Sequence, residues 1–230
     1  MNLPPVVLVT GTDTGVGKTV TTAALVALLA RRQSVAVLKP TQTGVRGAEP
    51  GDIDDVRRLT GHPHLHEGVR LTDPLAPTTA ARREGRTVPS VDDHAATVGR
   101  LLRDHDTVLV EGAGGLLVGL DDDGRTLADL AHALEAPCGF VVVTRAGLGT
   151  LNHTALTVEA LRRRDLPVLG LVVGASPQRP GLAEACNLND LPRTTAVPLL
   201  GQIPEGAGAL PAAAFVAQAP SWFDVPPGPG

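Results

Sequence analysis

A run of small and polar residues near the N-terminus, Gly11–Thr19 (GTDTGVGKT), has the composition of a phosphate-binding loop. Backbone N–H groups in such a turn, with the N-terminus of a helix behind them, form a cradle for phosphate oxygens. Lys18 is placed to reach the terminal phosphates of a nucleotide, and the Thr19 hydroxyl to bind magnesium. The run departs from the strict G-x-x-x-x-G-K-[ST] pattern, because five residues separate Gly11 from Gly17. We nevertheless predict a nucleotide-phosphate site here.

Lys18 and Lys39 are the only lysines of the chain, whose other basic residues are all arginine. An ammonium group is a compact point charge on a flexible stem, whereas a guanidinium is a wide planar fork, so a retained lysine indicates a role that arginine cannot fill. Lys39 ends an apolar run and precedes Pro40, and ligands of open α/β sheets bind beyond the carboxyl ends of strands. We therefore expect Lys39 and the Thr43 hydroxyl to face the same crevice as the phosphate loop. As a strand-end residue, Lys39 is expected to lie outside the core and to contribute little to folding.

An acidic residue, Glu111, ends the apolar run Thr107–Val110 and precedes the small residues Gly-Ala-Gly-Gly, which allow the backbone to approach phosphate closely. Magnesium prefers near-octahedral oxygen coordination and usually takes one or two carboxylates together with phosphate and water. Thr19, Glu111 and one of two aspartates, Asp52 or Asp54, would meet that requirement. The residue types alone leave the choice of aspartate open, because both also suit the N-terminus of a helix.

The elements that must position these residues alternate between strand and helix. Apolar runs without alternation are typical of strands buried on both faces of a parallel sheet, and they occur at Val6–Thr10, Val35–Leu38, Thr107–Val110, Phe140–Thr144 and Val168–Val173. Helices are predicted over Lys18–Arg32, Asp52–Leu59, Ser90 to about Arg103, Thr126–Leu134 and Thr150–Arg164. Residues 60–90, with the histidines of His62–His66, are predicted to be irregular with little helix. The pattern indicates one α/β layered domain over residues 1–218 with a mostly parallel central sheet, followed by a loosely held Pro/Gly-rich tail over 219–230.

Composition excludes several classes of function. The chain has 230 residues with 43% hydrophobic and 19% charged residues, which is typical of an ordinary globular domain. The net charge of −4 has the wrong sign for a nucleic-acid or anionic-membrane binder, and four aromatic residues offer no stacking platform for bases. Cys138 and Cys186 do not make a disulfide framework. Without an apolar run of about 18 residues or a basic N-terminal segment, we expect a cytoplasmic protein with no membrane or nucleic-acid partner.

Five segments, taken in order, resemble the dethiobiotin synthetase family: GTDTGVGKT, KPTQTG, VEGAGGLLV, GTLNHT and PLLGQIP. The resemblance extends over about residues 6–206. It implies a three-layer, P-loop NTPase-like fold and an ATP- and Mg²⁺-dependent cyclo-ligase of biotin biosynthesis. Such an enzyme would join CO2 to 7,8-diaminononanoate through a carbamate and a carbamic-phosphoric anhydride, and would release dethiobiotin, ADP and phosphate. The family also implies a homodimer with the substrate near the interface.

The resemblance assigns roles to residues of this chain. It makes Lys39 and Lys18 catalytic, and gives the Mg²⁺ ion to Thr19, Asp52 and Glu111, so that Asp52 is preferred over Asp54. Nucleotide contacts are expected from Thr14, Gly15, Val16, Gly17, Lys18, Thr19, Val20, Glu111, Gly112, Ala113, Gly114, Gly174, Ala175, Pro204, Glu205 and Gly206. Substrate contacts are expected from Thr14, Lys39 and Thr43 and, in the partner chain, from Leu148, Gly149, Thr150 and Asn152.

Two positions depart from the family pattern. Some members carry Glu where Gly15 stands, and many carry Asn-Asp where this chain has Gly174-Ala175, so that here only backbone groups can read the base. Two other functions use a similar phosphate loop. A switch ATPase of the ParA/MinD type would carry a lysine where Asp13 stands, and an amidoligase of the cobyrinate type usually adds a glutaminase domain, for which 230 residues leave no room.

Overall fold

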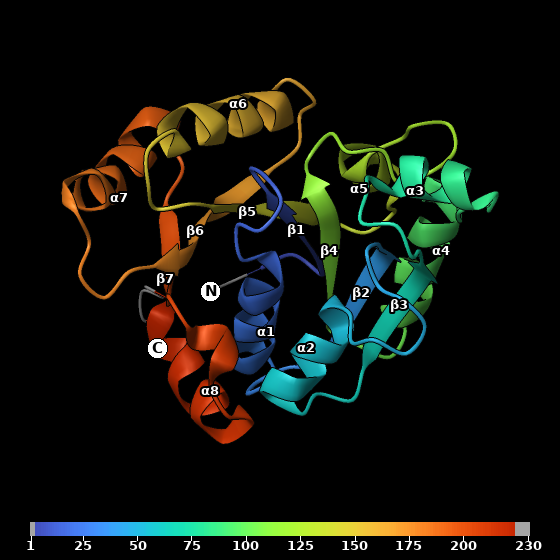
Figure 1. The fold of residues 1–230 in the computed structure, drawn as a ribbon, viewed down its shortest axis with the longest axis horizontal. Coiled ribbons are helices and arrows are strands. Elements are labelled where there is room, and N and C mark those ends of the chain that lie inside the picture. Colours follow the sequence, from blue (N-terminus) through green and yellow to red (C-terminus); the bar gives the residue numbers. More distant parts are fainter. Residues whose placement is uncertain (1–2, 224–230) are drawn as a thin grey trace.

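A seven-stranded sheet forms the centre of the computed structural model, which describes residues 3–223 (Figure 1). The strands are β1 (Val6–Gly11), β2 (Val35–Gln42), β3 (Leu65–Arg70), β4 (Thr107–Gly115), β5 (Cys138–Thr144), β6 (Val168–Ser176) and β7 (Leu199–Pro204). Their order is β3-β2-β4-β1-β5-β6-β7, and every neighbouring pair is parallel. All the carboxyl ends therefore meet at one edge, which is where ligands bind in sheets of this kind.

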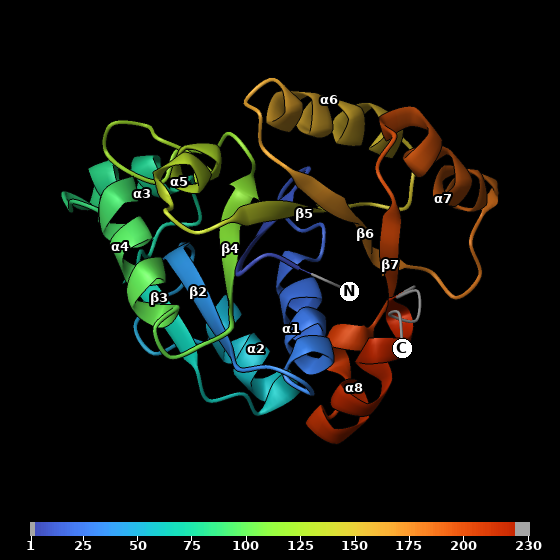
Figure 2. The same ribbon diagram turned by 180° about the vertical axis from the view of Figure 1, so that it is seen from behind.

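Helices cover both faces of the sheet (Figures 1 and 2). One face packs against α1 (Lys18–Leu29), α2 (Asp52–Thr60) and α8 (Ala212–Gln218). The other packs against α4 (Val91–Leu101), α5 (Leu127–Ala133), α6 (Thr150–Arg162) and α7 (Leu182–Thr195). Along β1, alternate residues enter the two layers, so that both faces must be apolar. The expected three-layer α/β architecture is confirmed.

The five predicted strands and five predicted helices are present, with ends that differ by a few residues. The prediction for residues 60–90 was wrong, because this segment contains β3 and the helix α3 (Pro77–Glu84). As an edge strand, β3 exposes polar side chains between its buried Leu65 and Val69, so it lacks a continuous apolar run. Pro77 occupies the first turn of α3, where a missing N–H costs nothing.

The predicted tail is not loose over its first residues. Residues 219–222 form a short 3-10 helix, Phe223 bridges to Gly201 in β7, and the Phe223 side chain is buried. The Trp222 ring packs edge-to-face on Phe215 of α8, with 5.2 Å between ring centroids. Residues 219–223 therefore belong to the domain; the rest of the predicted tail, 224–230, lies outside the described residues. Over residues 3–223, no helix combines the length and apolar character that crossing a membrane requires.

Candidate active site

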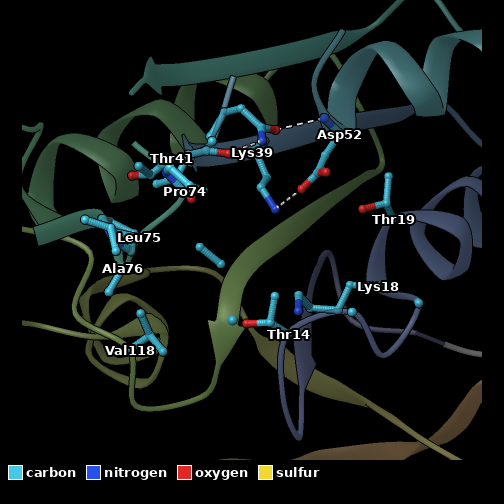
Figure 3. Close-up of a pocket in the computed structure, with 18 of the residues that line it drawn as sticks. Thr14, Lys18, Thr19, Lys39, Thr41, Asp52, Pro74, Leu75, Ala76 and Val118 are labelled. Atoms are coloured by element: carbon cyan, nitrogen blue, oxygen red, sulfur yellow. Dashed lines mark hydrogen bonds and ion pairs between the residues drawn. The ribbon is translucent and has the colours of Figure 1, made fainter. Parts of the chain in front are cut away.

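The site lies at the carboxyl edge of the sheet, where β1, β2 and β4 run side by side. Strand pairing sets Leu38 opposite Val110, and Val9 opposite Glu111, so Lys39 and Glu111 end their apolar runs at the same level. A cavity of about 830 Å³ opens there. Figure 3 shows side chains that line it, which come from the phosphate loop, from β2, from the start of α2, from residues 74–77 and from the segment around Val118.

The phosphate loop turns sharply between β1 and α1. Gly15 and Gly17 have φ of 69° and 97°, a left-handed conformation that glycine adopts without strain. Lys18 is buried, and its Nζ donates a hydrogen bond to the carbonyl oxygen of Asp13 at 3.1 Å. Burial, reinforced by the nearby charge of Lys39, holds the pKa of Lys18 below its ordinary value. Residues of the loop, including Lys18 and Thr19, line the cavity, so phosphate binding by this loop stays a prediction that its position allows.

Lys39 lies between two carboxylates. Its Nζ is 2.5 Å from Oδ2 of Asp52 and 3.0 Å from Oε1 of Glu111, and it donates a third bond to the carbonyl oxygen of Gly112 at 3.0 Å. Burial acts to lower the pKa of Lys39, but the charges of Glu111 and Asp52 outweigh it and raise the pKa. The ammonium group is therefore charged in the neutral range, and it is buried rather than solvated. The expectation that Lys39 lies outside the core was wrong.

The two acids respond differently to their surroundings. Burial raises the pKa of Glu111 even though Lys39 opposes the change. Burial also acts to raise the pKa of Asp52, but Lys39 overcomes it and the pKa is lowered. The Thr19 hydroxyl donates to Oε1 of Glu111 at 2.9 Å, which adds a third oxygen-bearing side chain beside the two acids.

This oxygen set fits magnesium. Two carboxylates and one hydroxyl are hard ligands, and magnesium normally completes its shell with phosphate and water. Among the described residues, no group of three or more His, Cys, Asp or Glu side chains is suited to hold a metal ion. A metal bound at this edge would thus be held by Thr19, Asp52 and Glu111, and the nucleotide would supply its other ligands.

Asp52 and Asp54 are clearly separated by the fold. Asp54 turns away from the cavity: its carboxylate contacts Arg57 at 2.9 Å and Arg70 at 3.2 Å, and accepts the Gly51 N–H at 2.9 Å. Asp52 alone of the pair faces Lys39 and lines the cavity (Figure 3). The register preferred from the family resemblance therefore agrees with the placement of the two side chains.

The residues that were expected to contact the adenine base of the nucleotide lie beside the phosphate loop and do not line the cavity. A side chain on Gly174, at the carboxyl end of β6, would collide with the carbonyl oxygen of Val16, so the two backbones touch there. The adjoining strand β7 leads into Pro204–Gly206, and the Glu205 N–H donates to the carbonyl oxygen of Ser176 at 2.8 Å. The two segments thus form one backbone surface next to the loop.

The residues expected to act from a partner chain lie away from the cavity of their own chain, at the start of α6. Leu148 is 88% exposed, and Gly149 and Asn152 are also exposed. The Thr150 hydroxyl is instead buried and bonded to Thr144 at 2.6 Å, so its side chain is not free for a ligand.

Several lining residues were not predicted from the sequence: Thr41, Gln42, Gly44, Pro74, Leu75, Ala76, Pro77 and Val118. Thr41 could have been found, because it lies two residues after Lys39 and therefore on the same face of β2. The wall of residues 74–77 carries no local indication of a site. Only the fold brings this segment, which leads into the first residue of α3, across from the phosphate loop.

Comparisons with known proteins identify relatives of this chain. A family model described as an AAA domain matches residues 6–209. The chain is 54% identical over 222 residues to an ATP-dependent dethiobiotin synthetase of Rhodococcus jostii, covering 95% of this chain and 94% of the relative. It is 53% identical to that of Streptomyces coelicolor, covering 96% and 93%. Among solved structures, the septum site-determining protein MinD of Pyrococcus horikoshii, a complex with Mg-ADP, matches with TM-score 0.58 and 18% identity over 95% of this chain and 91% of that one. A ParA family ATPase of Chlorobium tepidum matches with TM-score 0.56 and 12% identity over 95% and 98%, and both likenesses concern the fold alone.

Proposed function

Since the chain belongs to the dethiobiotin synthetase family, we propose that it is an ATP-dependent ligase that closes a cyclic urea on 7,8-diaminononanoate with CO2. The observation that carries the proposal is the position of Lys39, whose buried ammonium lies beside the phosphate loop and between Asp52 and Glu111. A fixed positive charge at that point can stabilise both an anionic carbamate and the charge of a phosphoryl group in transfer.

The proposed reaction has three steps. One amine nitrogen attacks the carbon of CO2 and loses a proton, which leaves a carbamate anion. A carbamate oxygen then attacks the γ-phosphorus of ATP, and the bond to the ADP oxygen breaks. The second amine attacks the carbamic-phosphoric carbonyl carbon, loses a proton and expels phosphate, which closes the ring. Lys39 faces the carbamate in the first two steps, while Lys18 and the phosphate loop hold the triphosphate.

Thr19, Asp52 and Glu111 would hold a Mg²⁺ ion, which supplies charge neutralisation for the phosphate oxygens when it is bound. The Thr14 and Thr43 hydroxyls would contact the diamine or its carbamate. The adenosine would extend past Val20 toward the backbone of Gly174–Ala175 and Pro204–Gly206. Phosphate contacts come from the loop N–H groups and from residues 111–114.

A homodimer would complete the substrate site. The exposed Leu148, together with Gly149 and Asn152, lies at the N-terminal end of α6, outside the cavity of its own chain. The N-terminus of a helix favours an anionic group, so the partner's α6 would suit the substrate carboxylate. Because the Thr150 hydroxyl is already bonded to Thr144, its contribution would be confined to the main chain.

The direct test is conversion of the diamine in the presence of ATP and bicarbonate, with the product identified by its mass. Dethiobiotin formed together with one ADP per ring supports the proposal. A switch ATPase would instead hydrolyse ATP at a rate that the diamine does not change and would give no ring product. Omitting bicarbonate or the diamine separates the ligase reaction from a contaminating phosphatase, whose ADP production needs neither.

A further inference from the structure

The side chain of Gln42, the last residue of β2, is buried and has both ends of its amide engaged. Its Oε1 accepts a hydrogen bond from the backbone N–H of Asp52 at 2.8 Å, and its Nε2 donates to the carbonyl oxygen of Thr43 at 3.0 Å. Turning the amide over would set its NH2 group against the Asp52 N–H and its oxygen against a carbonyl. The side chain is therefore fixed in one orientation.

The bond to Asp52 replaces a missing helix cap. Asp52 is the first residue of α2, and the first N–H groups of a helix need acceptors from outside it. The N-cap residue is Gly51, which has no side chain to supply one. Gln42 supplies it from the neighbouring strand. A Cβ on Gly51 would lie 2.9 Å from Oε1 of Gln42, so the glycine leaves the room that this contact needs.

We propose that Gln42 is a positioning residue that holds Asp52 in contact with Lys39. Lys39 and Gln42 lie three residues apart on β2, so one rigid strand fixes both the ammonium and the main chain of its acidic partner. The Asp52 side chain is 32% exposed, and without the anchor it can turn toward water and leave the Lys39 ammonium with Glu111 alone. The proposal rests on the proposed function only where Asp52 is said to serve the metal.

Because the chain has only two lysines, the surroundings of the Lys39 ammonium can be measured directly. In the full chain labelled with 13C at the lysine side chains, NMR shows two sets of lysine signals, and Lys18→Arg assigns them. The Asp52→Asn variant gives the chemical shift of Lys39 when its ion pair with Asp52 is lost. All spectra are taken at one pH without metal or nucleotide, so the readout is independent of turnover.

Two variants remove the anchor by different routes. Gln42→Met keeps the approximate volume and removes the acceptor, whereas Gly51→Ala keeps the acceptor and pushes it aside. We expect both to move the Lys39 signal most of the way to its Asp52→Asn position. The matched control is Asp54→Asn, which weakens the other cap of the same turn without touching Gln42, and it should leave the signal near that of the unmodified protein.

The inference is overturned if either anchor variant folds and keeps the unmodified Lys39 signal, or if Asp54→Asn shifts it equally. Should Gln42→Met fail to fold, Gly51→Ala still decides the question. In turnover assays we expect Gln42→Met to raise the Mg²⁺ concentration for half-maximal rate by about tenfold, since small misplacements of a ligand are costly. If Asp52→Asn leaves the Mg²⁺ requirement unchanged, the metal role of Asp52 fails, while the lysine signals still decide the role of Gln42.

Discussion

Lys39 and Glu111 form an ion pair whose side chains are only 4% and 1% exposed, with Nζ 3.0 Å from Oε1. Loss of one partner from a buried pair leaves the other charge uncompensated, which costs far more than loss of a surface pair. β2 and β4 each contribute one member of the pair. The pair therefore serves the chemistry of the site and also stabilises the contact between the carboxyl ends of these two strands.

Replacing Lys39 by Ala or Gln should impair both turnover and folding. We expect a loss of about 2–4 kcal/mol in transition-state stabilisation, as for other preorganised charge donors. We also expect about 3–5 kcal/mol lower stability, because Glu111 loses its partner. Steady-state kcat/KM and denaturant unfolding measure the two effects. Near-normal turnover by Lys39→Ala would remove the assignment of this lysine.

A double variant separates the two effects of Lys39. Lys39→Met combined with Glu111→Gln removes both charges and should recover much of the stability lost in Lys39→Met alone. Turnover should not recover, since neither charge is present. Recovery of turnover in the double variant would contradict a direct role for the ammonium group.

The acidic residues should divide into two classes. Asp52→Ala and Glu111→Ala are each expected to weaken Mg²⁺-dependent turnover by at least tenfold, since magnesium sites of this type rely on one or two carboxylates. Asp54→Ala should be far milder, because Asp54 contacts Arg57 and Arg70 instead of the cavity. Magnesium titrations of the rate provide the comparison. A sensitive Asp54 with a tolerant Asp52 would contradict this division.

The fold was largely predictable where burial is continuous. Strands such as β1 lie between two helical layers, so their continuous apolar runs are enough to predict them from the sequence. The edge strand β3 alternates with exposed polar residues, and α7 contains Pro192 and many polar side chains, so neither has a distinctive pattern. Both depend on contacts with the rest of the domain.

The site was predictable in its charged residues but not in what holds them. The phosphate loop, Lys39 and Glu111 follow strands, and parallel strands share one edge, so their convergence follows from order alone. The ion pair of Lys39 with Asp52 and the hydrogen bond from the Asp52 N–H to Gln42 both depend on how α2 packs beside β2. No spacing in the sequence encodes that packing, and residues 74–77 form a wall of the cavity although they are remote from the phosphate loop in the sequence.

Stability should fall in acid partly because of His94. This side chain on α4 is 2% exposed and its Nε2 has no hydrogen-bond partner among the described residues. Burial lowers its pKa, although Asp93 and Asp121 oppose the change. A base with a lowered pKa binds its proton more weakly when folded, so its neutral form stabilises the fold above about pH 6.5 and that stability is lost as the pH falls.

We therefore expect the free energy of unfolding of the His94→Leu variant to fall less steeply than that of the unmodified protein as the pH is lowered. The slope between pH 7 and pH 5 should decrease by at most about 1.4 kcal/mol per pH unit, the limit for one proton. Denaturant unfolding at several pH values measures it, with His153→Ala on the exposed face of α6 as the control. Parallel profiles for His94→Leu and the unmodified protein would show that another group is responsible.

Base selectivity should be weak, for a reason that lies in the backbone contact between Gly174 and Val16. A Cβ at Gly174 would collide with the Val16 carbonyl oxygen and lie 2.7 Å from a methyl group of Val143, so an asparagine cannot be accommodated there without moving the phosphate loop. We therefore expect adenine to be read by backbone groups of Gly174–Ala175 and Pro204–Gly206.

Backbone groups on glycine-rich segments adapt to different bases and leave no buried side-chain amide unpaired when the base changes. Most affinity should come from charge-assisted phosphate contacts, which are the same for every nucleoside triphosphate. We expect GTP and CTP to bind within about tenfold of ATP, or about 1.4 kcal/mol. Calorimetric titration of the three nucleotides against the Mg²⁺-loaded protein tests this, and Gly174→Ala should weaken all three alike by displacing the loop. A preference for ATP above about a hundredfold would show that the backbone surface alone selects adenine.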